Sequence, residues 1–270
     1  MRRLIYFLSL LLFFICLLAA WQYVTFYDNK LHIVFCNVGQ GDGIFIKTPN
    51  NKVILIDAGP DKSILSCLSS RMPFWDHTID FMVLAHPYID DYGGMQCVID
   101  RYNITYFFSE NLRPKDSNYL NFVKQLKSNN IDEIDVLAGS AVTFKNGLKL
   151  TFIGPSKNYL AASQEQACVV SLLTYGSFKA LFTCDSQVEG LEDAFKYWSP
   201  EHINLLQVPQ HGSKTGLDGQ ILDLLSPQLS VISVGKNNFD QPNPQTLQLL
   251  KEKGIKVLET INNGDVEIVN

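Results

Sequence analysis

Four predicted strands of this sequence stop at a carboxylate or a histidine, and this recurrence constrains the fold more than any other feature. The residues are Asp57, His86, Asp185 and His211. Any one of them could simply complete a turn, because Asp and His are common where strands end. In α/β folds, however, the strand ends converge on one rim and build sites there. We therefore expect the four residues to meet at one edge of an α/β domain.

The second of these strand ends carries the densest group of polar residues. His86 is followed within six residues by Tyr88, Asp90 and Asp91. Gly93-Gly94 comes next and precedes a helix-like segment, so the group is predicted to lie in a strand-to-helix loop. A histidine and two carboxylates can bind a divalent cation, whereas a phenol binds one only weakly. The same residues could instead form an ordinary loop in which an aspartate caps the helix.

Alternating strand and helix patterns fill the chain after residue 30. Strands are predicted at 31–38, 43–48, 52–57, 81–85, 106–108, 134–137, 145–154, 168–184 (a hairpin), 203–208 and 229–234, with two more near the end. Helices are predicted at 63–70, 95–99, 119–126, 188–197, 219–225 and 246–253. Residues 49–51 and 175–177 are typical of hairpin turns. The pattern predicts one α/β domain over residues 31–270.

Glycines cluster between the first two predicted strands, in the segment Gly39-Gln40-Gly41-Asp42-Gly43. So many glycines indicate unusual backbone angles or a close approach of the main chain to a neighbour. The segment is not a phosphate-binding loop, because no Lys-Ser/Thr pair follows and no helix begins there.

An apolar run at residues 4–20 predicts one crossing of a membrane. Arg2 and Arg3 precede it and aromatic residues follow it. Positive residues favour the cytoplasmic side, so we expect a single-pass anchor at 1–27 in the cytoplasmic membrane, with the domain outside the cytoplasm. A cleaved signal peptide is the alternative, because residues 18–20 (LAA) form an acceptable cleavage site.

Charge and cysteine content argue against several classes of function. The net charge of −5 argues against a broad basic face that wraps duplex DNA. The six cysteines form no Cys-x-x-Cys pair, so neither a zinc ribbon nor a redox motif is indicated. Most lie in apolar strands, where we expect buried thiols, with disulfides as the less favoured alternative.

Six motifs, in this order and spacing, resemble the metallo-β-lactamase superfamily, and in particular the extracytoplasmic hydrolase-like domain of ComEC-type competence proteins. The motifs are residues 37–42 (NVGQGD), 54–60 (ILIDAGP), 86–94 (HPYIDDYGG), 181–185 (LFTCD), 208–213 (VPQHGS) and 231–238 (VISVGKNN). The resemblance covers residues 31–269. It implies an αββα sandwich, in which two mixed sheets lie face to face between helices and the site lies along one edge.

The resemblance also implies a set of site residues. The implied metal ligands are His86, Asp90, Asp91, Asp185 and His211. The implied catalytic residues are Asp90 and Asp57, and the other site residues are Asp42, Tyr88, Gln210, Ser213 and Lys236.

The chain departs from the superfamily pattern at four positions. The central motif His-x-His-x-Asp-His keeps only its first histidine and its aspartate, with Tyr88 and Asp91 in place of the other histidines. Cys184 stands for the usual glycine and Gln210 for the first histidine of His-His-Gly-Ser. The changes make the site richer in oxygen, which favours Mn²⁺ or Mg²⁺, with Zn²⁺ possible. We expect one ion, with a second held weakly at most.

The function that the resemblance implies is a metal-dependent nuclease or phosphodiesterase. In this superfamily the ion lowers the pKa of a water molecule that attacks the substrate. The implied partners are DNA or another phosphodiester, the cytoplasmic membrane through the N-terminal helix, and channel proteins of DNA uptake. With a single apolar span, the chain is not expected to move DNA across a membrane by itself. The alternatives are a non-catalytic module that binds nucleic acid or a membrane partner, and a hydrolase of an unrelated small molecule.

Overall fold

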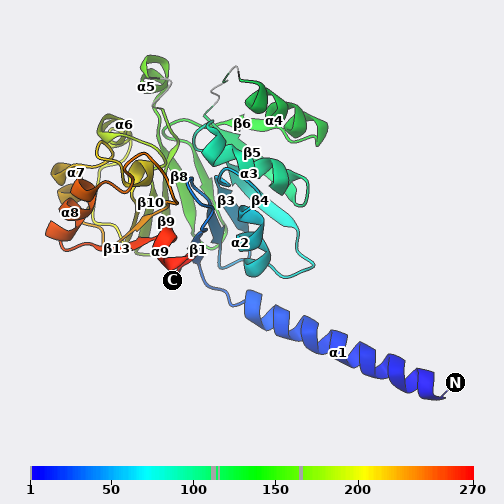
Figure 1. Cartoon of the computed structure of the whole chain (residues 1–270). Helices are drawn as coiled ribbons and strands as arrows, with labels where there is room; N and C mark the ends of the chain where they lie inside the picture. The colour runs from blue at the N-terminus through cyan, green and yellow to red at the C-terminus, as the bar shows by residue number, and fades with distance from the viewer. Residues whose placement is uncertain (1, 111–113, 115, 164–166) are drawn as a thin grey trace.

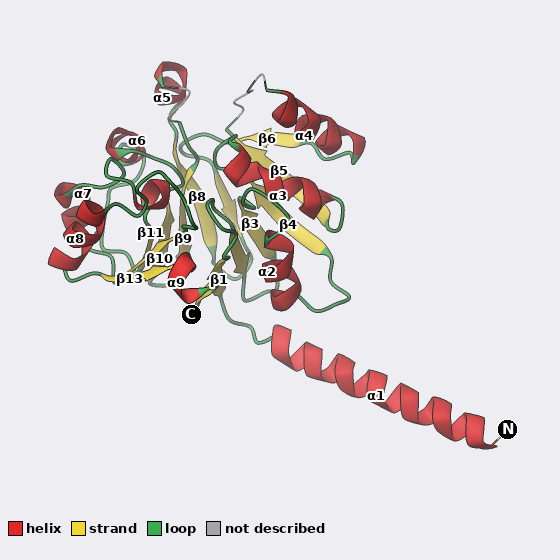
Figure 2. Cartoon of the chain, viewed as in Figure 1, coloured by secondary structure: helices red, strands yellow, loops and turns green. Residues whose placement is uncertain are grey.

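The computed structural model describes residues 2–110, 114, 116–163 and 167–270. Within these ranges, two seven-stranded sheets lie face to face (Figure 2). The first sheet has the order β14 (Val266–Val269), β1 (His32–Phe35), β2 (Ile44–Lys47), β3 (Val53–Ile56), β4 (Thr78–Val83), β5 (Asn103–Ser109) and β6 (Glu133–Asp135). The second has the order β13 (Lys256–Glu259), β12 (Leu229–Ile232), β11 (Leu205–Gln207), β10 (Phe178–Phe182), β9 (Val170–Tyr175), β8 (Lys149–Gly154) and β7 (Ala141–Thr143).

Helices cover the outer face of each sheet, which gives the four-layered αββα sandwich that the sequence predicted (Figure 1). The first sheet carries α2 (Ile64–Arg71), α3 (Ile89–Ile99) and α4 (Ser117–Ser128). The second carries α6 (Val188–Ala194), α7 (Gly219–Leu225) and α8 (Pro244–Glu252). Shorter segments are α5 (Lys157–Ala162), the 3₁₀ turn η1 (Pro209–Gly212) and α9 (Thr260–Asn263).

The central strands are buried on both faces, which explains their unbroken apolar sequences. In β2, Ile44 and Ile46 point into the core between the sheets, while Phe45 points outward against the helices of the first layer. Alternate side chains of a strand leave opposite faces, so a strand inside a sandwich needs apolar residues throughout. β3, β4 and β5 run parallel, as do β10, β11 and β12, so their carboxyl ends lie together at the edge of each sheet.

The prediction that Asp90 and Asp91 lie in a loop is wrong, because α3 already begins at Ile89. Both carboxylates lie in its first turn, where the helix dipole favours negative charge. Gly93 and Gly94 lie inside this helix and do not precede it. A Cβ on Gly93 would lie 2.1 Å from the Pro60 carbonyl oxygen, so these glycines allow backbone-to-backbone packing that ordinary helical side chains would prevent.

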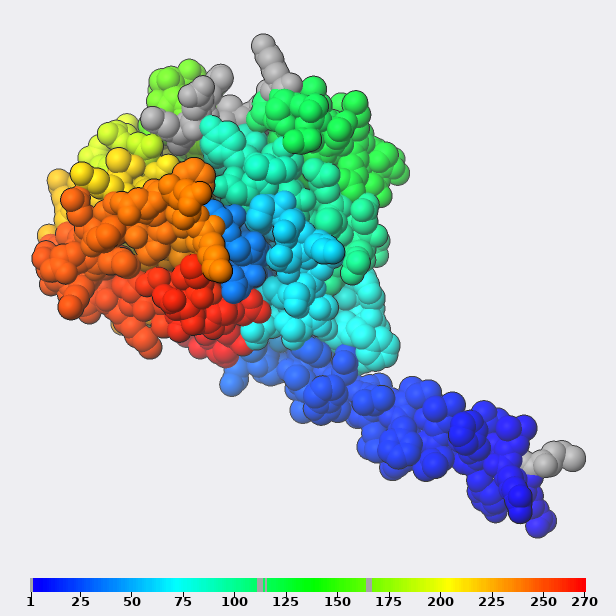
Figure 3. Space-filling view, viewed as in Figure 1, coloured from blue at the N-terminus to red at the C-terminus, as the bar shows by residue number. Residues whose placement is uncertain are grey.

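The glycine cluster before β2 makes the close approach that its sequence indicated. A Cβ on Gly41 would lie 2.2 Å from the carbonyl oxygen of Asp90. A Cβ on Gly235 would lie 2.3 Å from the carbonyl carbon of Gly39. Segments near residues 40, 90 and 235 therefore touch through their backbones, and Figure 3 shows the orange segment after β12 against the blue one near residue 40.

The expectation of buried thiols is wrong, because four of the six cysteines form disulfides and the two free ones, Cys16 and Cys97, are exposed and half-buried. Disulfides join Cys36 to Cys67 and Cys168 to Cys184, with Cα–Cα distances of 5.8 and 6.2 Å. The first ties the end of β1 to α2, and the second joins the segments that flank the β9–β10 hairpin. Sequence spacing could not reveal either pair, because only the packed fold brings their Cα atoms within bonding range.

The N-terminal helix α1 (Arg2–Phe26) extends away from the sandwich (Figure 1). It has the length and composition of a membrane span, and none of its side chains is buried. Among the residues that the structure describes, two hydrogen bonds join it to the domain. The Lys47 ammonium group donates to the carbonyl oxygen of Phe26, and the Phe74 backbone N–H donates to the Gln22 side chain.

Candidate metal site

Three residues, of which Asp42 and His211 are buried and Asp185 is half-buried, bring possible metal-binding atoms together at the edge of the sandwich. Asp42 comes from the β1–β2 loop, Asp185 follows β10, and His211 lies in the turn after β11. One donor atom from each lies within 4.8 Å of the others. Asp42 and His211 are 2% and 4% exposed, so bulk water solvates them little.

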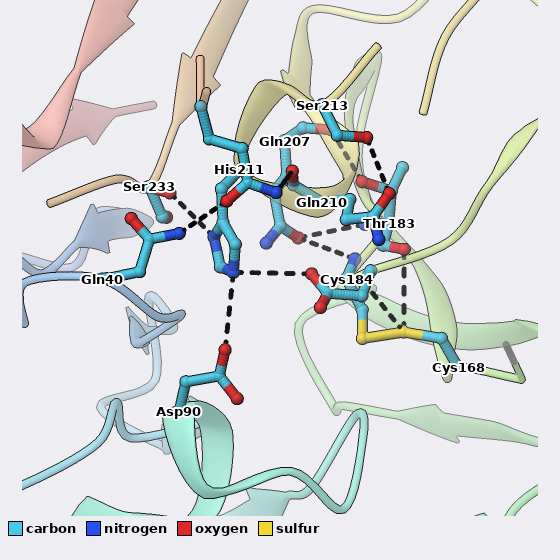
Figure 4. A network of polar contacts seen from close by, with 12 residues as sticks. Gln40, Asp90, Cys168, Thr183, Cys184, Gln207, Gln210, His211, Ser213 and Ser233 are labelled. Atoms are coloured by element: carbon cyan, nitrogen blue, oxygen red, sulfur yellow. Dashed lines mark hydrogen bonds and ion pairs between the residues drawn. A yellow bond between two sulfur atoms is a disulfide. The ribbon is translucent and has the colours of Figure 1, made fainter. Parts of the chain in front are cut away.

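The imidazole of His211 is oriented by the neighbouring strand. Its Nδ1 lies 2.9 Å from the Ser233 carbonyl oxygen, to which the Nδ1 hydrogen is donated. Nε2 therefore faces the carboxylates, 3.6 Å from Asp185 Oδ1 and 3.9 Å from Asp90 Oδ2 (Figure 4). Such a backbone partner on the second ring nitrogen is the usual means of fixing a metal-binding histidine.

The backbone of this turn adopts a rare conformation. Gln210 and His211 have φ angles of 49° and 53°, in the left-handed region that non-glycine residues seldom occupy. Asp57 and Cys184 share it, with φ angles of 56° and 49°. Strained backbone of this kind concentrates at functional sites, where the surrounding structure holds it in place.

Asp185 is positioned by a network around Gln207. The Gln207 side-chain oxygen accepts hydrogen bonds from the backbone N–H groups of Thr183 and Cys184, at 3.0 and 3.2 Å. The Thr183 hydroxyl donates to the Gln207 carbonyl oxygen at 2.8 Å, as Figure 4 shows. The Asp185 backbone N–H faces Cys168 Sγ at 3.2 Å. These contacts fix the turn that carries the carboxylate.

Three further aspartates surround this group. Asp57 and Asp91 are each 1% exposed, whereas the side chain of Asp90 is 35% exposed and opens to solvent. Asp57 Oδ1 accepts the Ala85 backbone N–H at 2.7 Å and thereby joins the ends of β3 and β4. Neither oxygen of Asp91 has a hydrogen-bond partner among the described residues.

Burial and mutual repulsion shift the pKa values of the ionisable groups at this site. Burial raises the pKa of Asp185 to about 6, and burial with repulsion from neighbouring carboxylates raises those of Asp57 and Asp91 well above their usual range. Burial opposes protonation of His211, but the nearby carboxylates Asp90, Asp185 and Asp42 outweigh it and raise its pKa to about 10. Asp42 Oδ1, Asp185 Oδ1 and His211 Nε2 also lack hydrogen-bond partners among the described residues. The donor set therefore fits a divalent cation.

His86 faces a residue that the sequence analysis missed. Its Nδ1 lies 3.4 Å from Oε1 of Glu110, and the two side chains are 3% and 2% exposed. Burial lowers the pKa of His86 to about 4 and raises that of Glu110 well above its usual range. Glu110 directly follows β5. The argument that picked out Asp57 and Asp185, namely that an ionisable residue at the end of a strand marks the site, would therefore have found it too. Among the described residues, the group within 4.8 Å does not include His86.

The remaining predicted site residues lie around this centre. Gln210 Oε1 accepts the Ser213 hydroxyl at 2.6 Å and the Thr215 hydroxyl at 3.2 Å, so its side chain stabilises its own loop. The ring of Tyr88 lies edge-on to His86, with centroids 4.3 Å apart, and the residue is 48% exposed. Lys236 is exposed in the loop after β12.

Solved structures identify the class of fold. The chain aligns with the metallo-β-lactamase fold protein YhfI of Bacillus subtilis at a TM-score of 0.57 and 16% identity, covering 89% of this chain and 100% of that one. It aligns with Zn²⁺-bound PqqB of Methylobacterium extorquens at a TM-score of 0.57 and 11% identity, covering 88% and 99%. It aligns with the diiron β-hydroxylase CmlA of Streptomyces venezuelae at a TM-score of 0.56 and 11% identity, covering 89% and 54%. The chain has the metallo-β-lactamase fold, as its motifs predicted.

Sequence relatives narrow the resemblance to competence proteins. The chain is 26% identical over 255 residues, 86% of its length, to ComE operon protein 3 of Bacillus subtilis. It is 22% identical over 258 residues, 89% of its length, to competence protein ComA of Neisseria gonorrhoeae. It spans about a third of the length of these two relatives, 32% of each. No family model matches the chain.

Proposed function

We propose that this chain is a metal-dependent hydrolase of phosphodiester bonds in nucleic acid, anchored at the outer face of the cytoplasmic membrane. The observation that carries the proposal is the group of Asp42, Asp185 and His211, whose donor atoms converge within 4.8 Å. A cation held between carboxylates that lie this close together offsets their mutual repulsion.

Asp42, Asp185 and His211 would hold the ion, with Asp90 and Asp91 beside them. Carboxylate oxygens outnumber the single imidazole nitrogen, which favours Mn²⁺ or Mg²⁺ and leaves Zn²⁺ acceptable. When bound, such an ion would polarise a phosphate oxygen and lower the pKa of a water molecule toward neutrality.

Asp90 and Asp57 would have different tasks. Asp90 is the carboxylate of the site that opens to solvent, 3.9 Å from the His211 imidazole, so it is placed to accept a proton from an attacking water. Asp57 is buried and binds the Ala85 backbone N–H, so it would position the strand ends that carry the site.

A loop beside the site supports nucleic acid as the substrate. Phe239, 73% exposed, lies near the tip of the loop after β12, close to the exposed Lys236. Asn237 braces this loop by hydrogen bonds to the Gly235 and Gln241 carbonyl oxygens, at 2.9 and 2.7 Å. The loop is also tied to the site, because the Gln241 side chain donates to the carbonyl oxygen of Gln210 at 3.2 Å. An exposed aromatic ring can stack on a base while a lysine attracts the phosphate backbone.

Mn²⁺ binding and cleavage of single-stranded DNA by the full chain in detergent test the proposal. Asp185→Asn should weaken Mn²⁺ binding by at least about tenfold and abolish cleavage, because it removes a charged oxygen ligand. Asp223→Asn is a matched control on the exposed face of α7, where the wild-type carboxylate pairs with Lys253. It should change neither property. If the wild-type chain binds no Mn²⁺, Mg²⁺ or Zn²⁺ at millimolar concentration, the enzymatic proposal is wrong.

A non-catalytic module that binds nucleic acid is the second candidate. It is favoured by two side chains that stand where the superfamily places ligands. Gln210 accepts a hydrogen bond from Ser213 of its own loop, and His86 lies beside Glu110, outside the group of Asp42, Asp185 and His211 found among the described residues. This candidate predicts DNA binding in gel-shift experiments with no cleavage in the presence of any of the three ions.

The disulfides support a location outside the cytoplasm. Cys36–Cys67 and Cys168–Cys184 would persist in an oxidising compartment and be reduced in the cytosol. Together with Arg2 and Arg3 in the first turn of α1, before the apolar run, they favour the N-in orientation. Protease added to intact cells should degrade the domain, and full protection would contradict the orientation. Similarity to competence proteins supports DNA-uptake channel proteins as partners.

A further inference from the structure

Two exposed aromatic side chains lie beside the end of α1 that faces the domain. Phe74 and Trp75, in the loop between α2 and β4, are 67% and 41% exposed. Their rings pack edge-to-face with centroids 4.9 Å apart. The Phe74 backbone N–H donates to the Gln22 side-chain oxygen at 2.9 Å, so the loop is joined directly to the helix. In Figure 1, α2 accordingly lies next to the domain end of α1.

The position of Gln22 along α1 sets the height of this loop relative to a bilayer. Gln22 lies 20 residues after Arg2, which corresponds to about 30 Å at a rise of about 1.5 Å per residue. The hydrocarbon core of a bilayer is also about 30 Å thick. With Arg2 at the inner headgroups, Gln22 reaches the outer boundary of the hydrocarbon, and Phe74 lies at the same level.

Other aromatic residues of α1 occupy this level too. Trp21 and Tyr23 are each 61% exposed, and the ring of Tyr23 stacks on Tyr27 at 4.9 Å. Trp and Tyr concentrate at membrane interfaces, where their rings contact acyl chains and their polar atoms contact water. Phe74 and Trp75 add aromatic rings of the domain to those of the helix at this level.

Two hydrogen bonds close the turn that presents these rings. Met72 and Pro73 are buried and anchor it to the domain. The Asp76 backbone N–H donates to the Pro73 carbonyl oxygen, and the Asp76 carboxylate accepts the Thr78 N–H. Closing a turn in this way reduces the cost of bringing backbone polar groups near hydrocarbon.

We propose that Phe74 and Trp75 insert into the outer interface of the bilayer that α1 crosses. The proposal rests on the membrane span of the proposed function and adds a second point of contact. One helix leaves the domain free to rotate about its connection, whereas a helix and an inserted loop together fix one face of the sandwich toward the lipid.

The three tryptophans of the chain, at positions 21, 75 and 198, allow a direct test. Full-length variants that keep one tryptophan each, with phenylalanine at the other two positions, are reconstituted in phosphatidylcholine vesicles. Some vesicles carry bromine on the acyl chains near the headgroup, which quenches nearby indole fluorescence. Trp21 reports on the span, Trp75 on the loop, and Trp198, after α6 on the far side of the sandwich, serves as the control.

The brominated lipid should quench Trp75 by a fraction similar to Trp21 and leave Trp198 unchanged. Trp75 emission should also shift to shorter wavelength when Trp75-only protein moves from detergent into vesicles. If Trp21 is quenched and Trp75 is not, the loop does not contact the membrane and the inference is overturned. The membrane span of α1 would still hold, and the aromatic pair would then face a protein partner. If Trp21 is not quenched, α1 does not span the bilayer and the membrane part of the proposed function fails, and the loop inference fails with it.

Discussion

Gly41 allows the β1–β2 loop to pass the start of α3 with no side chain between them. We predict that Gly41→Ala lowers the melting temperature and weakens Mn²⁺ binding, because the new Cβ would lie 2.2 Å from the Asp90 carbonyl oxygen and displace the helix that carries Asp90. Gly139→Ala is the control. Gly139 also has a positive φ, 97°, but open space around its Cβ position, so it should cost only the roughly 1–2 kcal/mol of a left-handed backbone. Equal melting temperatures for the two variants would refute the steric argument.

At the same scale, Arg71 should stabilise the fold in a pH-dependent way. It pairs with Glu267 and, at 3.8 Å, with Asp265. Burial tends to raise the pKa of Glu267, but its contacts with His32 and Arg71 together lower it. A carboxylate with a lowered pKa stabilises the fold above its unfolded pKa, near 4.3, and this contribution is lost as the pH falls through the folded value.

Arg71→Gln should therefore lower the melting temperature at pH 7, and the difference from wild type should shrink below about pH 4. Arg101→Gln, at an exposed position beside α3, should leave the melting temperature unchanged at both pH values. A difference that stays constant down to pH 3 would show that Arg71 acts by packing and not by charge.

At the scale of the element, the Cys36–Cys67 disulfide should be a main source of stability. It links β1 to α2 across 31 residues of chain, which in a loop-entropy treatment corresponds to about 3–4 kcal/mol. Cys67→Ser should lower the midpoint of denaturant unfolding accordingly, and dithiothreitol, which also reduces Cys168–Cys184, should lower the wild-type midpoint by at least as much. Cys97→Ser removes a free cysteine and should leave the midpoint unchanged. If dithiothreitol has no effect on the wild type, the disulfide does not form.

The elements that sequence predicts well are those whose signal is local. Turn residues predict the hairpin turn at 175–177, and apolar spacing predicts the helix at 219–225. The structure contains both. The start of α3 could not be predicted from the sequence. Its glycines allow a close contact with Pro60, which lies more than 30 positions earlier in the chain. The disulfides and the contact of His86 with Glu110 are tertiary as well. Convergence of Asp185 and His211 was predictable because both follow strands of one sheet.

At the scale of the whole molecule, α1 should be dispensable for folding, because none of its side chains is buried. We predict that residues 28–270 fold alone, with cooperative thermal unfolding followed by circular dichroism. A form starting at residue 31 should melt at a lower temperature, because it loses Asp28, whose carboxylate contacts His32 at 2.8 Å and Lys47 at 3.4 Å. Failure of the longer form to fold would mean that α1 contributes to the core.

The antiparallel pairing of β14 with β1 places the two ends of the domain side by side. The Leu31 N–H donates to the Asn270 carbonyl oxygen and the Asn270 N–H donates to the Leu31 carbonyl oxygen, both at 2.9 Å. The domain is thus closed on itself, and a short linker between residues 270 and 31 would complete the circle. New ends opened at the exposed β9–β10 turn would give a circular permutant in which Asp185 and His211 precede Asp42 along the chain. The same edge of the sandwich would still bring the three together, since strand pairing and not the order of synthesis holds them there.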